Sequence, residues 1–223
     1  MDNSKYFYQI TVTAVLLLSI ISAGRAQKSM DSLSLDDRVR SFLMERESAW
    51  HDMNIPEIDG QLLYDIIVQN KYTRALEIGT STGRSGIWIA WALSKTGGRL
   101  ITIEINESRH REAVENFKQT GLSQYIDARL ADAHQLVREL EGPFDFVFCD
   151  ADKNWYKNYF IDLYPKLEVN GCYTAHNVSD SGWRRLWGGG AQEFYQYVRE
   201  LPNMDTSVNT DGNGVSISFK RSE

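Results

Sequence analysis

Short apolar runs and amphipathic stretches alternate along most of the chain. The apolar runs are rich in β-branched and aromatic residues, and they predict buried strands over Ala75–Ile78, Leu100–Ile105, Ile126–Leu130, Phe144–Cys149 and Gly171–Ala175. Between them, helical spacing predicts helices over Ser85–Ser94, Ser108–Thr120, Ala133–Leu140 and Trp155–Tyr164. Strands without a polar face that alternate with helices predict a doubly wound α/β fold with a mostly parallel sheet covered on both sides.

The pattern changes at both ends of this alternating region. Apolar residues with helical spacing predict two N-terminal helices, Asp31–Ser48 and Gln61–Asn70. Near the C-terminus, a helix over Ala191–Leu201 precedes two further strand-like stretches, Thr206–Val208 and Gly214–Lys220. Asp and Gly residues join these last two, which predicts an antiparallel hairpin at the edge of a seven-stranded sheet.

The first residues have a composition of their own. Lys5 precedes the apolar run Ile10–Ala23, and Gly24 and Ala26 are small residues at the positions that a signal peptidase reads. Residues 1–26 are thus either a secretory signal peptide, with an exported or periplasmic domain, or a marginal membrane anchor. The positive residues after the run would keep an anchored domain in the cytoplasm. We expect residues 27–70 (helices and an access segment) and 71–223 to form one globular unit.

Composition narrows the choice of partners. The 223 residues are 42% hydrophobic, which suits a single domain with a substantial core. A net charge of -6 and the absence of a basic run argue against nucleic acid and favour a small-molecule partner. Cys149 and Cys172 both lie in predicted strands, so we expect two buried free thiols rather than a disulfide.

Two strand ends suggest a nucleoside-type cofactor. The first ends in Glu77 and runs into a turn with Gly79 and Gly83, and the second ends in Glu104, which can accept hydrogen bonds from a ribose. The glycine spacing departs from the G-x-G-x-x-G that seats a pyrophosphate, and the Glu77 carboxylate suits a cationic ligand. S-adenosylmethionine is therefore favoured over NAD. A nicotinamide oxidoreductase and a non-catalytic exported binding protein remain alternatives.

Four motifs carry a resemblance to a known family. ALEIGTSTGRS, ITIEIN, FDFVFCDADKNWY and TAHNV, in this order, resemble class I S-adenosylmethionine-dependent O-methyltransferases of the catechol and caffeoyl-CoA branch. The resemblance spans Met53 to Lys220 and implies methyl transfer to a hydroxyl, phenolic by analogy, of a small acceptor. It implies a homodimer through the N-terminal helices. The donor-binding residues that it implies are Glu77, Gly79, Thr80, Ser85, Glu104, Ala133 and Asp152.

The same resemblance assigns roles around the acceptor. Asp150 would bind a divalent cation, Lys153 would be the general base for the acceptor hydroxyl, and Met53 would lie near the reacting methyl. Asn177 would contact the cation or the substrate. Trp155 follows a strand end, where it either forms a wall for an aromatic substrate or packs in the core.

His176 departs from the family pattern, in which an Asp precedes the Asn at the end of the fifth strand. An imidazole removes a negative charge and a hard oxygen ligand, which makes Mg²⁺ dependence doubtful. Three interpretations follow: Asp150, His176 and Asn177 bind a softer cation, His176 is a metal-free base, or His176 only hydrogen-bonds Asp150. We rank the metal-free base first and the structural role last.

Overall fold

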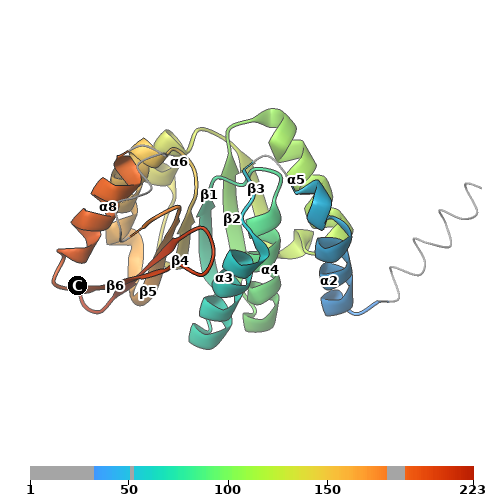
Figure 1. The fold of residues 1–223 in the computed structure, drawn as a ribbon, viewed down its shortest axis with the longest axis horizontal. Helices are drawn as coiled ribbons and strands as arrows, with labels where there is room; N and C mark the ends of the chain where they lie inside the picture. Colours follow the sequence, from blue (N-terminus) through green and yellow to red (C-terminus); the bar gives the residue numbers. More distant parts are fainter. Residues whose placement is uncertain (1–32, 51–52, 180–188) are drawn as a thin grey trace, which may run out of the picture.

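The computed structural model describes residues 33–50, 53–179 and 189–223. Seven strands form one sheet in the order β3-β2-β1-β4-β5-β7-β6, with helices on both of its faces (Figure 1). The first five strands are parallel to one another, and β7 is antiparallel to both β5 and β6. The predicted doubly wound sheet with a C-terminal antiparallel hairpin is confirmed. The strands are β1 (Arg74–Ile78), β2 (Arg99–Glu104), β3 (Ile126–Leu130), β4 (Phe144–Cys149), β5 (Leu167–His176), β6 (Met204–Asn209) and β7 (Val215–Lys220).

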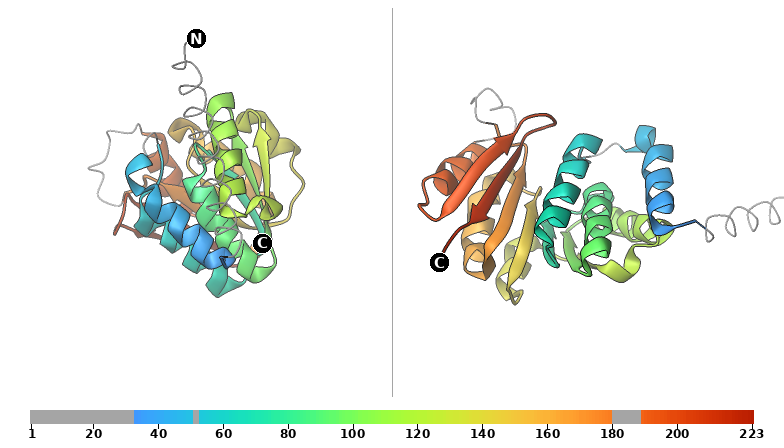
Figure 2. Two further views of the ribbon diagram at one scale, coloured as in Figure 1. Left: turned by 90° about the vertical axis from the view of Figure 1, so that its right-hand side faces the viewer. Right: turned by 90° about the horizontal axis from the view of Figure 1, so that it is seen from below.

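Each face of the sheet has its own helical layer and its own core (Figure 2). One layer comprises α2 (Leu35–Glu45), α3 (Glu57–Asn70), α4 (Arg84–Thr96) and α5 (Glu107–Thr120). The other comprises α6 (Ala133–Glu139), α7 (Tyr156–Leu163) and α8 (Gly190–Arg199). Short 3-10 turns complete the described helices: η1 (Glu47–Ala49), η2 (Ser123–Tyr125), η3 (Lys153–Trp155) and η4 (Tyr164–Lys166).

Strand β4 shows why the central strands read as continuous apolar runs. Phe146 and Phe148 point into the core beneath α2 to α5, whereas Val147 and Cys149 point into the core beneath α6 to α8. Successive side chains of a strand alternate between the two faces, and here both faces are covered. Both cysteines are buried and free, as predicted.

Several predicted boundaries differ from the structure, and two of these differences have a clear physical reason. Helix α3 begins at Glu57 rather than Gln61, so Gly60 lies inside the helix instead of before it. A Cβ at Gly60 would come within 2.3 Å of Trp88 on α4. This glycine allows two helices to pack closely instead of starting one. Strand β5 begins at Leu167 rather than Gly171, because residues 168–170 are exposed and two of them, Glu168 and Asn170, are polar, which hides the start of the strand.

The N-terminal helices belong to the same folded unit as the sheet. Val39 and Phe42 of α2 and Leu63 of α3 lie in one core cluster with Phe146 of β4. The expected signal peptide or anchor, residues 1–26, lies outside the described residues. Within the described ranges, no helix has the length and apolar character needed to cross a bilayer.

Candidate active site

The candidate site lies at the carboxyl ends of β1 and β4, where the strand order reverses. Gly79 follows β1 with φ of 98°, and a Cβ there would come within 2.7 Å of the Asp150 carbonyl oxygen after β4. Asp150 N–H also donates to Ile78 O at 2.9 Å. Glycine is required here both for its left-handed backbone and for the close approach of the two strand ends. Open α/β sheets bind ligands at this switch point.

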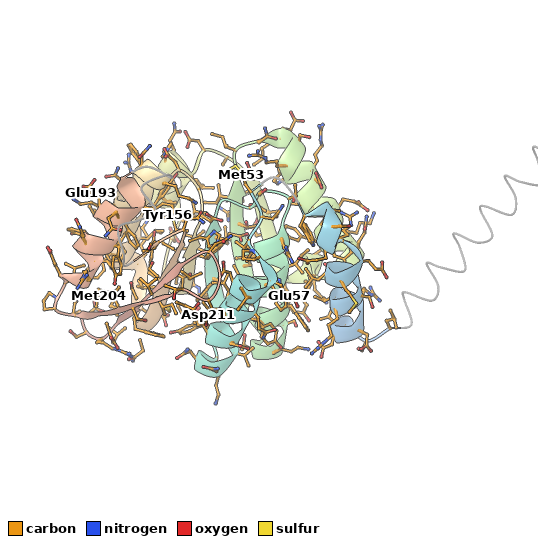
Figure 3. The ribbon with its side chains drawn as sticks, viewed as in Figure 1. Met53, Glu57, Tyr156, Glu193, Met204 and Asp211 are labelled. Carbon is orange, nitrogen blue, oxygen red and sulfur yellow. The ribbon has the colours of Figure 1, made fainter. Side chains whose placement is uncertain are left out.

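A cavity of about 370 Å³ opens at these strand ends. Four of the predicted donor-binding residues line it: Gly79, Glu104, Ala133 and Asp152. Asp150 and Met53 also line it; Met53, labelled in Figure 3, is 67% exposed and has a φ of 64°. The other three predicted donor residues, Glu77, Thr80 and Ser85, are buried and do not line the cavity. They lie on β1, just after β1 and on α4, respectively.

Glu77 is a fully buried carboxyl group held by Thr102, which is itself bonded to Thr80. Its Oε2 accepts a hydrogen bond of 2.5 Å from Thr102 Oγ1, which is itself 2.5 Å from Thr80 Oγ1. Its Oε1 is buried and has no hydrogen-bond partner among the described residues. Burial raises the pKa of Glu77 to about 8, against the lowering influence of Ser85 and Thr102. An unpartnered buried oxygen favours a ligand that brings a donor or a positive charge.

Glu104 is held differently, by the backbone. Its Oε2 accepts from Ser81 N–H and its Oε1 from Asn106 N–H, both at 2.8 Å. The carboxylate is thereby fixed at the rim of the cavity, and each oxygen keeps capacity for a further hydrogen bond. This fits the predicted contact with a diol such as a ribose.

His134 is a cavity residue whose role is not evident from the sequence, where we would expect it to be solvated or to cap a helix. Its ring stacks on Tyr159 with an interplanar angle of 9° and lies 4.5 Å, centroid to centroid, from Trp155. Its Nδ1 lies 3.1 Å from Asp132 and its Nε2 lies 3.6 Å from Asp152. Trp155 therefore packs against the cavity-lining His134, and the cavity lining does not include Trp155 itself.

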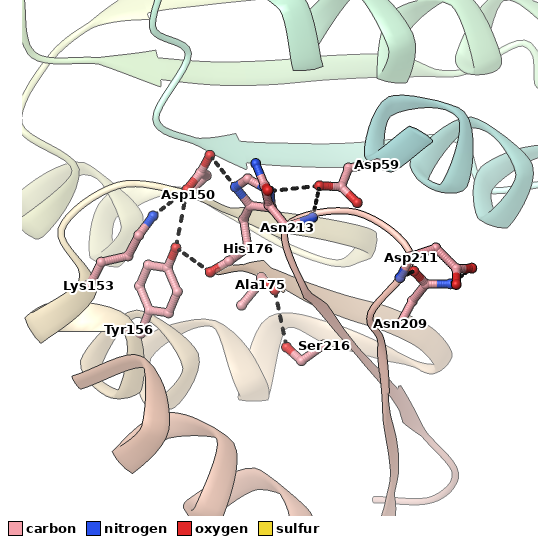
Figure 4. A network of polar contacts seen from close by, with 10 residues as sticks. All are labelled: Asp59, Asp150, Lys153, Tyr156, Ala175, His176, Asn209, Asp211, Asn213 and Ser216. Atoms are coloured by element: carbon pink, nitrogen blue, oxygen red, sulfur yellow. Dashed lines mark hydrogen bonds and ion pairs between the residues drawn. The ribbon is translucent and has the colours of Figure 1, made fainter. Parts of the chain in front are cut away.

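On the acceptor side, Asp150 gathers two donors from the segment that follows β4 (Figure 4). Lys153 Nζ forms an ion pair with Asp150 Oδ1, and Tyr156 OH lies 3.4 Å from the same oxygen and 3.1 Å from His176 O. Burial alone would raise the pKa of Asp150, but the positive charges of His176 and Lys153 hold it below its ordinary value. The predicted pair of Asp150 and Lys153 is thus assembled in one place.

His176 lies between two carboxylates. Its Nδ1 is 3.0 Å from Asp150 Oδ2, and its Nε2 is 2.9 Å from Asp59 Oδ2. Burial alone would lower its pKa, but Asp150 and Asp59 raise it to about 9. The ring is therefore a cation near neutral pH, which argues against His176 as the base. The geometry favours the third interpretation, a hydrogen-bonding role toward Asp150, extended to a second carboxylate.

The predicted softer-cation site of Asp150, His176 and Asn177 stays a prediction. A protonated imidazole has no lone pair for a metal, and both ring nitrogens of His176 already face carboxylates. No group of three His, Cys, Asp or Glu side chains with metal-binding geometry occurs in the described parts of the chain. Asn177 follows β5 with a left-handed backbone, φ 58°. Its predicted contact with a cation or substrate stays a prediction.

Asp59 is the second residue that sequence reasoning misses. It is 1% exposed, and besides His176 it accepts a hydrogen bond of 3.0 Å from Asn213 N–H, in the turn between β6 and β7. One sequence signal does exist. Asp59 precedes Leu63 by four positions and Ile66 by seven, so an acid lies on the apolar stripe of α3, where it requires a partner.

Comparison with known proteins gives the family. The O-methyltransferase family model matches residues 26–207. The chain belongs to the O-methyltransferase family. A catechol O-methyltransferase of Niastella koreensis is 45% identical over 111 residues, which are 48% of this chain and 50% of that protein. A caffeoyl-CoA O-methyltransferase of Medicago sativa is 28% identical over 193 residues, 75% of each chain. The matches cover 50%, 64% and 63% of the first three curated relatives, less than two thirds of their length.

Solved O-methyltransferases share the fold. An O-methyltransferase from Bacillus cereus, in complex with SAH, superposes with a TM-score of 0.71 at 24% identity, covering 87% of this chain and 96% of that one. The O-methyltransferase TomG from Streptomyces achromogenes, in complex with SAM, gives 0.70 at 24% identity, covering 83% and 90%. At these identities the likeness shows the fold of this O-methyltransferase family member and nothing of its chemistry.

Proposed function

We propose that the protein transfers a methyl group from S-adenosylmethionine to a phenolic hydroxyl of a small acceptor. The observation that carries this proposal is the position of Asp150, which lines the donor-side cavity and is also paired with Lys153. Family membership favours the methyl donor over a nicotinamide. The names of the relatives, catechol and caffeoyl-CoA O-methyltransferases, favour an aromatic acceptor.

The chain's carboxylates fit this donor. The unpartnered Oε1 of Glu77 suits the amino group of the methionine part, and the fixed carboxylate of Glu104 suits the ribose hydroxyls. Ala133 and His134, which also line the cavity, would then lie beside the adenine of the donor. S-adenosylmethionine supplies an electrophilic methyl on a sulfonium centre. The protein supplies the position and the charge of the nucleophile.

Lys153 is the residue that acts on the acceptor. Methyl transfer breaks the bond between sulfur and methyl as the bond between oxygen and methyl forms, and the acceptor hydroxyl must lose its proton. A phenol is largely protonated near neutral pH, and a nearby ammonium lowers its pKa. Because Lys153 is paired with Asp150, we propose that its ammonium stabilises the phenolate while the proton passes to water. A neutral Lys153 that accepts the proton itself is the alternative.

One activity screen tests the proposal. The purified protein is incubated with S-adenosylmethionine and a panel of catechols, other phenols and aliphatic alcohols, with chelator or with added Mg²⁺, Mn²⁺ or Zn²⁺. We expect O-methylated phenols, detected by mass spectrometry. Calorimetry with S-adenosylhomocysteine and with NAD separates the alternatives, since binding of NAD alone would refute the proposal.

The role of a cation can be tested at His176. If His176→Asp creates Mg²⁺-dependent turnover, the native imidazole marks a departure from the metal-dependent chemistry of the family. If that variant is inactive under every condition of the screen, His176 has a role that a carboxylate cannot supply.

A further inference from the structure

Asp59 is 1% exposed, although an acid in the first turn of a helix needs no burial to stabilise it. Its neighbours on α3, Leu63 and Ile66, face the apolar core, and α3 approaches α4 closely at Gly60. A carboxylate in such surroundings is costly unless it is hydrogen-bonded or paired with a positive charge. Asp59 is therefore expected to have specific partners, and these partners lie toward the candidate site.

One carboxylate oxygen of Asp59 makes both of its hydrogen bonds. Oδ2 lies 2.9 Å from His176 Nε2 and accepts from Asn213 N–H at 3.0 Å. On the other oxygen, Oδ1, the turn between β6 and β7 closes so tightly that a Cβ on Gly212 would come within 2.0 Å. The carboxylate is thus fixed in position from two sides.

From Asp59 a continuous chain of contacts leads to the proposed catalytic lysine (Figure 4). His176 Nε2 faces Asp59, and its Nδ1 is 3.0 Å from Asp150 Oδ2. Asp150 Oδ1 in turn holds Lys153. Four side chains from α3, β5, the end of β4 and η3 are therefore linked in series, and neither Asp59 nor His176 lines the cavity.

We propose that Asp59 is a positioning residue for methyl transfer, acting through His176 on Asp150 and Lys153. This proposal rests on the proposed function. Asp59 holds the imidazole so that Nδ1 faces Asp150, and the imidazole then fixes the carboxylate that orients the Lys153 ammonium. Without Asp59, the ring loses the partner that sets its rotation, and the ammonium moves relative to the acceptor oxygen. A displacement of about 1 Å at reacting groups is enough for a loss of about 100-fold in rate.

The test is Asp59→Asn, which keeps the volume of the side chain. We expect kcat to fall about 10- to 100-fold, while the Kd of S-adenosylhomocysteine stays within about twofold, since Glu77 and Glu104 do not contact Asp59. Asp65→Asn is the matched control: it changes an acid on the same helix, whose carboxylate accepts a hydrogen bond from Gln61 at 2.8 Å. We expect that control to keep the wild-type kcat.

A second variant distinguishes positioning from support of the turn. His176→Asn keeps a polar group near the Nδ1 position and removes Nε2. If Asp59 acts through His176, adding Asp59→Asn to His176→Asn lowers kcat by less than about twofold more. If the two losses multiply, Asp59 supports the turn at Asn213 independently of His176, and the proposal is overturned.

A spectroscopic measurement separates this proposal from the proposed function. Nitrogen-15 NMR of histidine-labelled protein should show both His176 ring nitrogens hydrogen-bonded, and Asp59→Asn should shift the Nε2 resonance. An unchanged Nε2 resonance overturns the positioning role, whatever the turnover. Absence of methylation by the wild-type protein, with the resonance shifted as expected, would instead refute methyl transfer while leaving the contact of Asp59 with His176 established.

Discussion

The two halves of the candidate site handle negative charge in opposite ways. On the donor side, Glu77 has a buried oxygen without a partner among the described residues, and Glu104 receives only backbone N–H groups. On the acceptor side, Asp150 and Asp59 are neutralised by His176 and Lys153. The donor half therefore offers an unpaired carboxylate oxygen beside the cavity to a ligand with positive charge or hydrogen-bond donors. In the acceptor half both carboxylates already face a cationic side chain, although Asp59 Oδ1 is buried without a hydrogen-bond partner among the described residues.

This difference indicates where each kind of residue contributes. Binding to the donor half gains hydrogen bonds that the free protein lacks, so changes there should alter affinity. The acceptor half gains little from ground-state contacts, and its fixed charges matter when the phenolate forms, so changes there should alter kcat. The predictions below test this division.

Lys153→Ala should have the largest effect. The loss of the ammonium beside Asp150 should lower kcat by about 10²- to 10⁴-fold, because Lys153 is the residue proposed to act on the acceptor hydroxyl. The Kd of S-adenosylhomocysteine, measured by calorimetry, should stay within about twofold. Lys157→Ala is the control, since Lys157 pairs with Glu193 at 2.9 Å, away from Asp150. If the Lys153→Ala variant keeps the wild-type kcat, the proposed role of Lys153 is wrong.

Stability should fall as the pH rises from about 6 to 9. The folded pKa of His176 is about 9, above its value of 6.5 in an unfolded chain, so its contribution is complete below pH 6.5 and is lost through pH 9. A difference of this size corresponds to about 3 kcal/mol. Glu77, whose folded pKa is also raised, to about 8, acts in the same direction between pH 4.5 and 8. Urea unfolding at pH 6, 7.5 and 9 measures the slope; His176→Asn should flatten it, and an unchanged slope would contradict the assignment.

Glu77→Gln should weaken donor binding while largely sparing the acceptor half. The amide can still accept from Thr102, but unlike the carboxyl, which has a pKa of about 8, it cannot become the anion that we propose pairs with the donor's amino group. A charge-assisted hydrogen bond contributes about 1.5 to 3 kcal/mol, so we expect the Kd of S-adenosylhomocysteine to rise about 10- to 100-fold. Glu115→Gln on α5, which removes an acid that bonds Gln119 at 3.0 Å, should leave Kd unchanged. An equal rise in both variants would point to net charge rather than to the buried carboxylate.

Gly212→Ala should destabilise the protein without any change of charge. The new methyl would come within 2.0 Å of Asp59 Oδ1, so either the turn or the carboxylate must move, at a cost of about 1 to 3 kcal/mol. Gly189→Ala is the matched control, because a Cβ there meets no described atom within 4 Å. Thermal unfolding of both variants gives the difference. Equal melting temperatures would show that the turn is not held against Asp59.

The sequence predicts the sheet well because its signal is local. A strand covered on both faces must be apolar at almost every position, as Phe146 to Cys149 are. The donor residues Glu77 and Glu104 are also predictable, because each directly ends a strand or nearly so. Their position at one edge of the sheet then follows from the parallel topology.

The state of the acceptor half depends on contacts that the sequence does not display. His176 is identifiable as unusual, but its protonated state depends on Asp150 and also on Asp59, which lies 117 positions earlier. His134 owes its place to stacking on Tyr159, and Thr102 owes its role to a neighbouring strand. Among these residues, Asp59 has a signal in its own segment of the sequence, because it is an acid on the apolar stripe of α3.

The turn between β6 and β7 affects the order in which the parts of the site can form during synthesis. Asn213 reaches back across 154 positions to Asp59, so α3 leaves the ribosome long before its partner is synthesised. Until the hairpin pairs with β5, the nascent chain lacks one of the two groups that hold the Asp59 carboxylate. The acceptor half of the site is therefore completed only after its α3, β4 and β5 residues have all been synthesised.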